Sequence, residues 1–199
     1  MSTPYEQTGR SRQKHRTRAA LVAAARELVA TGGRPPTVAE AAEAAAISRT
    51  TAYRYFPTQQ ALLIAAHPEI VATSMLPAGV GADPEVRLEA AVRGFMAMVV
   101  DTEPQQRTML RLSLGVQTTA DELPLRQGRA IGWFCEALEP LTDRLGEDGV
   151  RRLAVAVRAV SGVEALVWLT DVAGLTTEEA VDQMAWSAVA LVRRAQDEA

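Results

Sequence analysis

The stretch of sequence that decides the fold covers residues 37–62 and reads TVAEAAEAAAISRTTAYRYFPTQQAL. Thr37 has the character of a helix N-cap, and Glu40, three positions later, completes a capping box that opens a short Ala-rich helix. Ser48 is a second N-cap candidate, for a helix that runs through Phe56 and stops at the following proline. Two short helices joined by a turn of this length, with a longer helix before them, predict a helix-turn-helix.

Helical patterns continue on both sides of this stretch. Upstream, apolar residues recur at helical spacing, which predicts an amphipathic helix from about Lys14 to the glycine pair 32–33. Downstream, Thr58 can open a further helix. Residues 1–12 are polar, so we expect a flexible tail there, followed by a helix-turn-helix domain over residues 13–66.

The remaining residues, 67–199, also favour helices, and no alternating pattern of convincing length predicts a strand. Asp83-Pro84 combines an N-cap with a proline at the first helical position. Two helices are expected to close the chain, over about 151–170 and about 177–195, and a capping box at Thr176 opens the second of them. The predicted fold is all-α, with an N-terminal three-helix helix-turn-helix domain followed by a larger helical domain.

The last two predicted helices carry more apolar surface than one small core can cover, because the first of them is apolar on most faces. Pairing with a second copy in a four-helix interface covers this surface, so we expect a homodimer. Ala159, Gly162 and Ala165 would allow the helices to approach closely. The alternative is that both helices are central in a monomer.

The net charge of −3 conceals an asymmetry along the chain. Residues 1–60 carry nine Lys or Arg against four Asp or Glu, whereas residues 61–199 carry 12 against 20. A basic N-terminal segment on an acidic body favours a polyanionic partner at that end. Chance clustering of surface charge is the alternative.

Several classes of protein are disfavoured. The single cysteine, Cys135, forms no intramolecular disulfide, and its apolar surroundings indicate a core residue or, alternatively, a redox switch. A polar N-terminus and the lack of an uncharged run long enough to span a bilayer predict a soluble, cytoplasmic protein that does not bind membranes. No metal-ligand cluster, Gly-rich phosphate loop or nucleophile arrangement is evident, so we expect no catalytic residue, no metal and no cofactor.

The central stretch resembles the DNA-binding segment of TetR-type transcriptional regulators, without a gap through the second, third and fourth helices. The residues that carry the resemblance are Thr37, Val38, Glu40, Ala42, Ile47, Ser48, Arg49, Thr51, Tyr53, Arg54, Tyr55, Phe56, Pro57, Ala61 and Leu62. The resemblance implies a homodimeric repressor that binds a palindromic operator in double-stranded DNA and is released by a small-molecule ligand bound to residues 67–199. An activator, a regulator without a ligand, or a dimeric interaction protein without DNA binding are the alternatives.

The candidate DNA contacts lie mostly on the third predicted helix. Ser48 can cap that helix and bind a phosphate at its positive end, and Arg49 and Arg54 can each make bidentate contacts to guanine. The full set of candidates is Thr37, Ser48, Arg49, Thr50, Thr51, Tyr53, Arg54 and Tyr55, with Lys14 and Arg16 from the basic N-terminal segment. Packing in the core is the alternative for the two tyrosines, and a solvated basic face is the alternative for the N-terminal residues, which also include His15 and Arg18.

Comparison with the family pattern suggests roles for individual residues and shows two positions at which this chain differs from the pattern. By resemblance, positions 51, 53 and 54 are DNA contacts and Thr37 reaches a phosphate. Ala46 stands in the turn where the family usually has glycine, so a left-handed backbone there would cost about 1–2 kcal/mol. Gln59 stands where a phosphate-contacting lysine is common, which removes one expected backbone contact.

A small, largely apolar effector is expected to bind between central helices of the larger domain. Methionine and aromatic side chains suit adaptable apolar pockets, although they are also ordinary core residues. The apolar candidates are Phe95, Met96, Met109, Trp133 and Phe134, and the polar anchors are Arg107 and His67.

Overall fold

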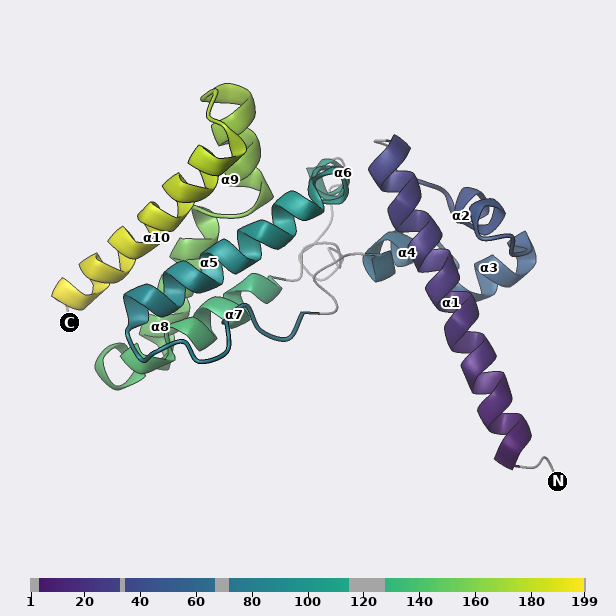
Figure 1. Cartoon of the computed structure of the whole chain (residues 1–199), viewed down its shortest axis with the longest axis horizontal. Helices are drawn as coiled ribbons and strands as arrows, with labels where there is room; N and C mark the ends of the chain where they lie inside the picture. The colour runs from purple at the N-terminus through teal and green to yellow at the C-terminus, as the bar shows by residue number, and fades with distance from the viewer. Residues whose placement is uncertain (1–3, 33–34, 67–71, 115–127, 199) are drawn as a thin grey trace. The chain divides into compact units, whose positions relative to one another are not determined.

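The computed structural model of the chain describes residues 4–32, 35–66, 72–114 and 128–198, and within these ranges it contains helices and no strand. The chain divides into two compact units (Figure 1). The first unit comprises residues 1–70 and 107–126, and the second comprises residues 71–106 and 127–199. The predicted all-α fold is confirmed.

The first unit contains α1 (Pro4–Gly32), α2 (Val38–Ala44), α3 (Arg49–Tyr55) and α4 (Gln59–Ala66). Its small core holds Leu21, Val22, Ala25, Val38, Ala41, Ala42, Ala52, Phe56, Leu62, Ala65 and Ala66. The N-terminal half of α1 extends beyond α2, α3 and α4 (Figure 1). Because α1 begins at Pro4, most of the segment expected as a tail, residues 1–12, is helical.

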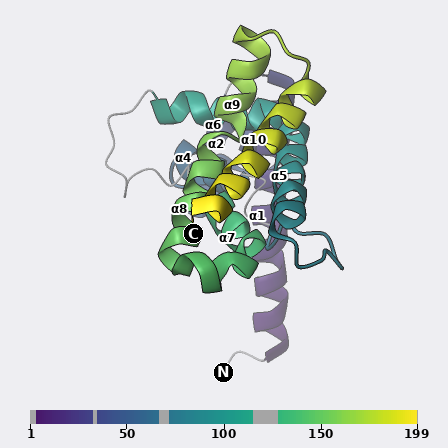
Figure 2. The same cartoon turned by 90° about the vertical axis from the view of Figure 1, so that its left-hand side faces the viewer.

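The second unit is built around two long helices, α5 (Pro84–Asp101) and α10 (Thr177–Glu198), which lie side by side (Figures 1 and 2). The other elements of this unit are α7 (Arg129–Ala137), the short η3 (Glu139–Leu141), α8 (Thr142–Ala159), α9 (Val163–Val167) and the π-helical η4 (Trp168–Val172). The boundary between the two units falls within α6 (Glu103–Leu114), whose residues from Arg107 onward belong to the first unit. The helix α7 packs on α5 and α8, and α8 also packs on α10. The largest side chains of this core include Phe95, Met96, Trp133, Phe134, Leu138, Leu166 and Met184.

The N-caps read from the sequence form in the structure. Thr37 and Glu40 make a reciprocal capping box at α2, and Thr176 and Glu179 make another at α10. The carboxylate of Asp83 accepts a hydrogen bond of 2.9 Å from the backbone N–H of Glu85 at the start of α5. These side chains satisfy N–H groups that the helices leave without an internal partner.

The prediction of one continuous helix over residues 151–170 is wrong, because the chain forms two helices there with a break between them. α8 ends at Ala159 and α9 begins at Val163. Between them Gly162 has a φ of 98°, a conformation that side chains disfavour, and it is buried in the core. It therefore does not serve as a small residue at a helix interface.

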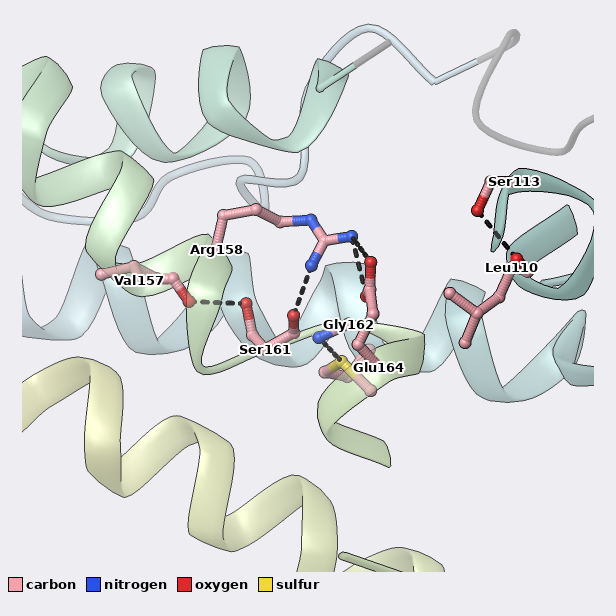
Figure 3. Close-up of polar contacts among 8 residues, drawn as sticks. Leu110, Ser113, Val157, Arg158, Ser161, Gly162 and Glu164 are labelled. Carbon is pink, nitrogen blue, oxygen red and sulfur yellow. Dashed lines mark hydrogen bonds and ion pairs between the residues drawn. The ribbon is translucent and has the colours of Figure 1, made fainter. Parts of the chain in front are cut away.

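A polar cluster closes this interruption (Figure 3). The guanidinium of Arg158 donates to the carbonyl of Ser161 at 2.6 Å and to the carboxylate of Glu164 at 3.0 Å. The same guanidinium lies 5.7 Å from the ring centroid of Phe95, and the N–H of Gly162 donates to the sulfur of Met96 at 3.2 Å. The cluster satisfies backbone groups that a continuous helix would have paired internally.

The stretch Glu139–Val172 is long and apolar enough to cross a membrane by length and composition alone. It comprises η3, α8, α9 and η4, with backbone breaks at Gly146 (φ 69°) and Gly162 and with the Arg158–Glu164 ion pair inside it. Its elements pack against α5, α7 and α10. The stretch is therefore interrupted and partly packed within the second unit, with 39% of its apolar window buried.

Candidate nucleic-acid interface

The N-terminus of α3 is held by Ser48. The backbone N–H of Thr51 donates to Ser48 Oγ at 3.3 Å, and Ser48 Oγ donates to Thr51 Oγ1 at 2.9 Å. Ser48 has an extended backbone and is exposed, so its hydroxyl lies at the surface beside the positive end of the helix.

One face of α3 is exposed and polar, and the opposite face enters the core. Arg49 and Tyr53 are four residues apart, as are Thr50 and Arg54, so the four side chains share a surface. Ala52 on the other face is fully buried. The structure therefore brings together Arg49, Thr50, Tyr53 and Arg54 on the surface, next to the Ser48 cap.

Thr51 and Tyr55 lie at the edge of this surface. Both are half-buried, and Tyr55 packs against the core of the first unit. Tyr53 is 47% exposed, so it contributes less to this packing than Tyr55 does. The Thr51 hydroxyl is the acceptor for Ser48, which makes it part of the cap.

The turn between α2 and α3 adopts the left-handed backbone that the sequence raised as a possibility. Ala46 has a φ of 53°, and it is the one residue other than glycine with a positive φ in the described parts of the chain. The N–H of Ile47 donates to the carbonyl of Ala42 at 2.8 Å, and that of Ala46 donates to Glu43 at 3.1 Å. This pair of bonds is a Schellman motif, which fixes the angle between the two helices.

The N-terminus of α2 is braced from α4. Thr37 Oγ1 accepts from the N–H of Glu40 at 3.2 Å and donates to the Glu40 carboxylate at 2.9 Å. The side-chain amide of Gln59 donates to the carbonyls of Pro35 and Pro36, at 3.0 and 3.1 Å. Gln59 thus holds the segment before the cap instead of presenting a cation to DNA.

Lys14, Arg16 and Arg18 of α1 are exposed. Lys14 lies on the surface, and the guanidinium of Arg16 donates to the side chain of Gln13. The guanidinium of Arg18 lies over the ring of Phe56, 5.3 Å from its centroid. This last contact joins residues 38 positions apart, and no pattern in the sequence indicates it.

The candidate ligand residues do not form one group. Phe95, Trp133 and Phe134 pack on one another in the core of the second unit, with ring centroids 6.1 and 5.7 Å from that of Phe95. Met96 is buried beside them, as a partner of Gly162. Met109 belongs instead to the first unit, where it packs with Val29 and Leu63.

The remaining candidates and the cysteine also have definite places. Arg107 is half-buried on the part of α6 that belongs to the first unit, and His67 lies outside the described residues. Cys135 is half-buried on α7, where burial raises the pKa of its thiol more than the charge of Arg151 lowers it. A raised pKa keeps the thiol protonated and poorly reactive, which fits a packing role.

The fold and the exposed, capped α3 define a helical DNA-binding protein of the helix-turn-helix type. Residues 21–66 match the family model described as bacterial regulatory proteins, tetR family. This match supports a DNA-binding transcriptional regulator of this kind, and it covers residues 21–66 of the 199-residue chain. No curated protein matches the chain.

Proposed function

We propose that the protein is a homodimeric repressor that binds a palindromic operator through α3 and is released by a small-molecule ligand. The observation that carries this proposal is the surface formed by Arg49, Thr50, Tyr53 and Arg54 on a helix whose other face is buried. Residues 44–66, which include α3 and α4, contain no Asp or Glu. Neither of these two helices therefore brings a negative charge towards a phosphate backbone.

The roles follow from the chemistry of each side chain. Arg49 and Arg54 are assigned to guanine edges, each worth about 1–3 kcal/mol of discrimination when the contact is bidentate. Thr50 is assigned to a thymine methyl or a phosphate, and Tyr53 to a phosphate. Phosphate contacts are also assigned to Thr37, Ser48, Thr51 and Tyr55 and, from α1, to Lys14 and Arg16. Phosphate contacts position the protein, and base contacts give sequence preference.

A homodimer through the last helices is supported by apolar side chains that the second unit leaves in solvent. Trp168 is 59% exposed, Val172 is 72% exposed and Trp186 is 68% exposed, and Val155 is 44% exposed on α8. Exposed apolar surface of this kind marks sites of association. A two-fold dimer pairs the same patch on both copies and presents two copies of α3 to the two halves of a palindrome.

Ligand release is assigned to the second unit. The apolar candidates Phe95, Met96, Trp133 and Phe134 are closely packed there, so a ligand would enter by separating them. A ligand that binds more tightly to the DNA-incompetent state weakens operator binding by that difference in affinity. The effector is expected to be small and largely apolar, and the protein is expected to act in the cytoplasm.

The experiment that tests the proposal is a selection of genomic fragments with the purified protein at moderate salt, followed by sequencing of the retained DNA. A recovered palindrome, bound by a protein of dimer mass, supports the dimeric repressor. Retention of no particular sequence contradicts operator binding and favours an interaction protein without DNA binding. Expression of a reporter placed behind the recovered palindrome then distinguishes a repressor from an activator.

A further inference from the structure

The helix α1 and the C-terminal end of α3 meet at a contact between an arginine and an aromatic ring. Phe56 is the C-cap residue of α3, and its ring is 3% exposed. Arg18 of α1 is exposed, and its guanidinium lies 5.3 Å from the centroid of that ring. The positive charge of Arg18 is therefore held at the surface where α3 ends.

Arg18 is exposed while it makes this contact. The attraction of a cation to an aromatic ring does not pair the five N–H donors of the guanidinium with an oxygen acceptor. Within the part of the chain that the structure describes, Arg18 forms no ion pair. An arginine bound in this way can still make a bidentate contact to a phosphate.

Neighbouring residues restrict the position of Arg18 in the protein without bound DNA. Leu21, three residues further along α1, is fully buried and anchors this turn of the helix to the same core that contains Phe56. A cation held over an aromatic ring is attracted by the ring electrons even at an exposed site. Binding an anion therefore requires little further ordering of the side chain, in contrast to a free surface arginine.

The position also suits the DNA backbone. In helix-turn-helix proteins the bases meet the N-terminal part of the recognition helix, and phosphates flank the groove beside its other parts and the preceding helices. Lys14 lies one turn before Arg18 on the same face of α1, and both side chains are exposed. These two cations give α1 a basic face near Phe56.

We infer that Arg18, held over the ring of Phe56, binds an operator phosphate beside the groove that receives α3. The inference rests on the proposed operator binding and adds to it a backbone contact that positions α3 without reading a base. It distinguishes Arg18 from Lys14 and Arg16, two described residues of α1 for which the structure shows no contact with a ring.

The test measures the dissociation constant for the selected palindrome over a series of salt concentrations. Arg18→Ala is expected to weaken binding by about tenfold at moderate salt. It is also expected to reduce the slope of log K against log salt by about 0.9 for each protomer, with an unchanged base preference. Arg18→Lys keeps the charge and restores most of the slope. Arg111→Ala, which removes an exposed arginine of α6, is the matched control and leaves the slope unchanged.

A second measurement locates the phosphate. Single backbone positions of the palindrome are replaced by neutral methylphosphonates, and binding is compared for the wild type and for Arg18→Ala. One position per half-site is expected to weaken the wild type and to leave the variant unaffected, a pattern that a general loss of stability would not produce. Circular dichroism checks that the variant keeps its helices.

The outcomes separate the two proposals. If the wild type selects a palindrome but Arg18→Ala keeps its slope and its sensitivity at every phosphate, the inference about Arg18 is wrong and operator binding stands. If Arg111→Ala loses as much slope as Arg18→Ala, the effect is one of net charge and the inference is likewise wrong. If the wild type selects no sequence, operator binding fails, and the role of Arg18 fails with it.

Discussion

At the scale of single residues, the first unit depends on one alanine in an unfavourable conformation. Ala46 adopts a φ of 53° because the Schellman motif between α2 and α3 requires a left-handed residue there. Comparison with the family pattern had already singled out this position, because the pattern usually has glycine where this chain has Ala46. It could not give the hydrogen bonds that hold the alanine in place, because these depend on how Ile47 packs into the core.

Replacing this alanine tests the strain directly. Ala46→Gly is expected to stabilise the protein by about 0.5–1 kcal/mol, because the gain from relieving a left-handed alanine exceeds the added entropy of the unfolded chain. Urea unfolding followed by circular dichroism measures the change. Ala45→Gly is the control, because Ala45 has a right-handed backbone with a φ of −84°, and glycine there is expected to destabilise. A wild type as stable as Ala46→Gly would contradict the prediction.

Arg54 carries the prediction about sequence preference. It is exposed in the last turn of α3, and its loss is expected to weaken binding to the best operator by about 1–3 kcal/mol while relaxing the preference at one base pair. Selection from a randomised library with Arg54→Ala measures both effects. Gln60→Ala, at an exposed residue of α4, should leave the selected sequence unchanged. If Arg54→Ala selected the same consensus sequence as the wild type, the prediction that Arg54 contacts a base would be wrong.

At the scale of elements, the interruption between α8 and α9 is the largest departure from the sequence prediction. Apolar periodicity runs through residues 151–170 without a gap, so it predicts one helix. The residues that mark the break, Arg158, Ser161 and Glu164, appear in the sequence as a polar stripe. Their role depends on the direction of the Arg158 side chain, which periodicity does not specify. By contrast, the caps at Thr37 and Thr176 depend on neighbours in sequence and were predictable.

The break can be tested at Gly162. A Cβ atom there would lie 2.6 Å from Nη1 of Arg158, and the φ of 98° disfavours any side chain. Gly162→Ala is expected to destabilise the protein by about 1–3 kcal/mol. Gly81→Ala is the control, because a Cβ at Gly81 meets no atom within 4 Å. Thermal unfolding compares the two variants, and equal melting temperatures would show that the break tolerates a side chain.

The capping box of α10 gives a prediction about pH. The backbone N–H and hydroxyl of Thr176 lower the pKa of Glu179, because both donate to its carboxylate. A lowered pKa in the folded state means that the charged cap stabilises the protein above the ordinary pKa of glutamate and is lost as the pH falls through the lowered value. Glu179→Gln should therefore be less stable than the wild type at neutral pH and approach it in acid. A difference that is constant with pH, in thermal unfolding across this range, would contradict the prediction.

At the scale of the whole molecule, the exposed tryptophans of the second unit are assigned to association between copies. Replacing both Trp168 and Trp186 with glutamate places charges on a patch that a dimer would bury, so the variant is expected to be monomeric. Light scattering measures the mass. Val86→Glu, at an apolar residue of α5 that is 53% exposed, is the control and should keep the mass of the wild type. A wild type of monomer mass would contradict the interface.

The distribution of aromatic residues has a spectroscopic consequence. All three tryptophans, Trp133, Trp168 and Trp186, belong to the second unit. The aromatic residues of α3 are both tyrosines. Emission excited at the red edge of the absorption band, where tyrosine does not absorb, therefore reports on the second unit alone. Effector titrations followed by this emission and operator titrations followed by labelled DNA can be read in the same sample without interference. The coupling between the two units then becomes a directly measurable quantity.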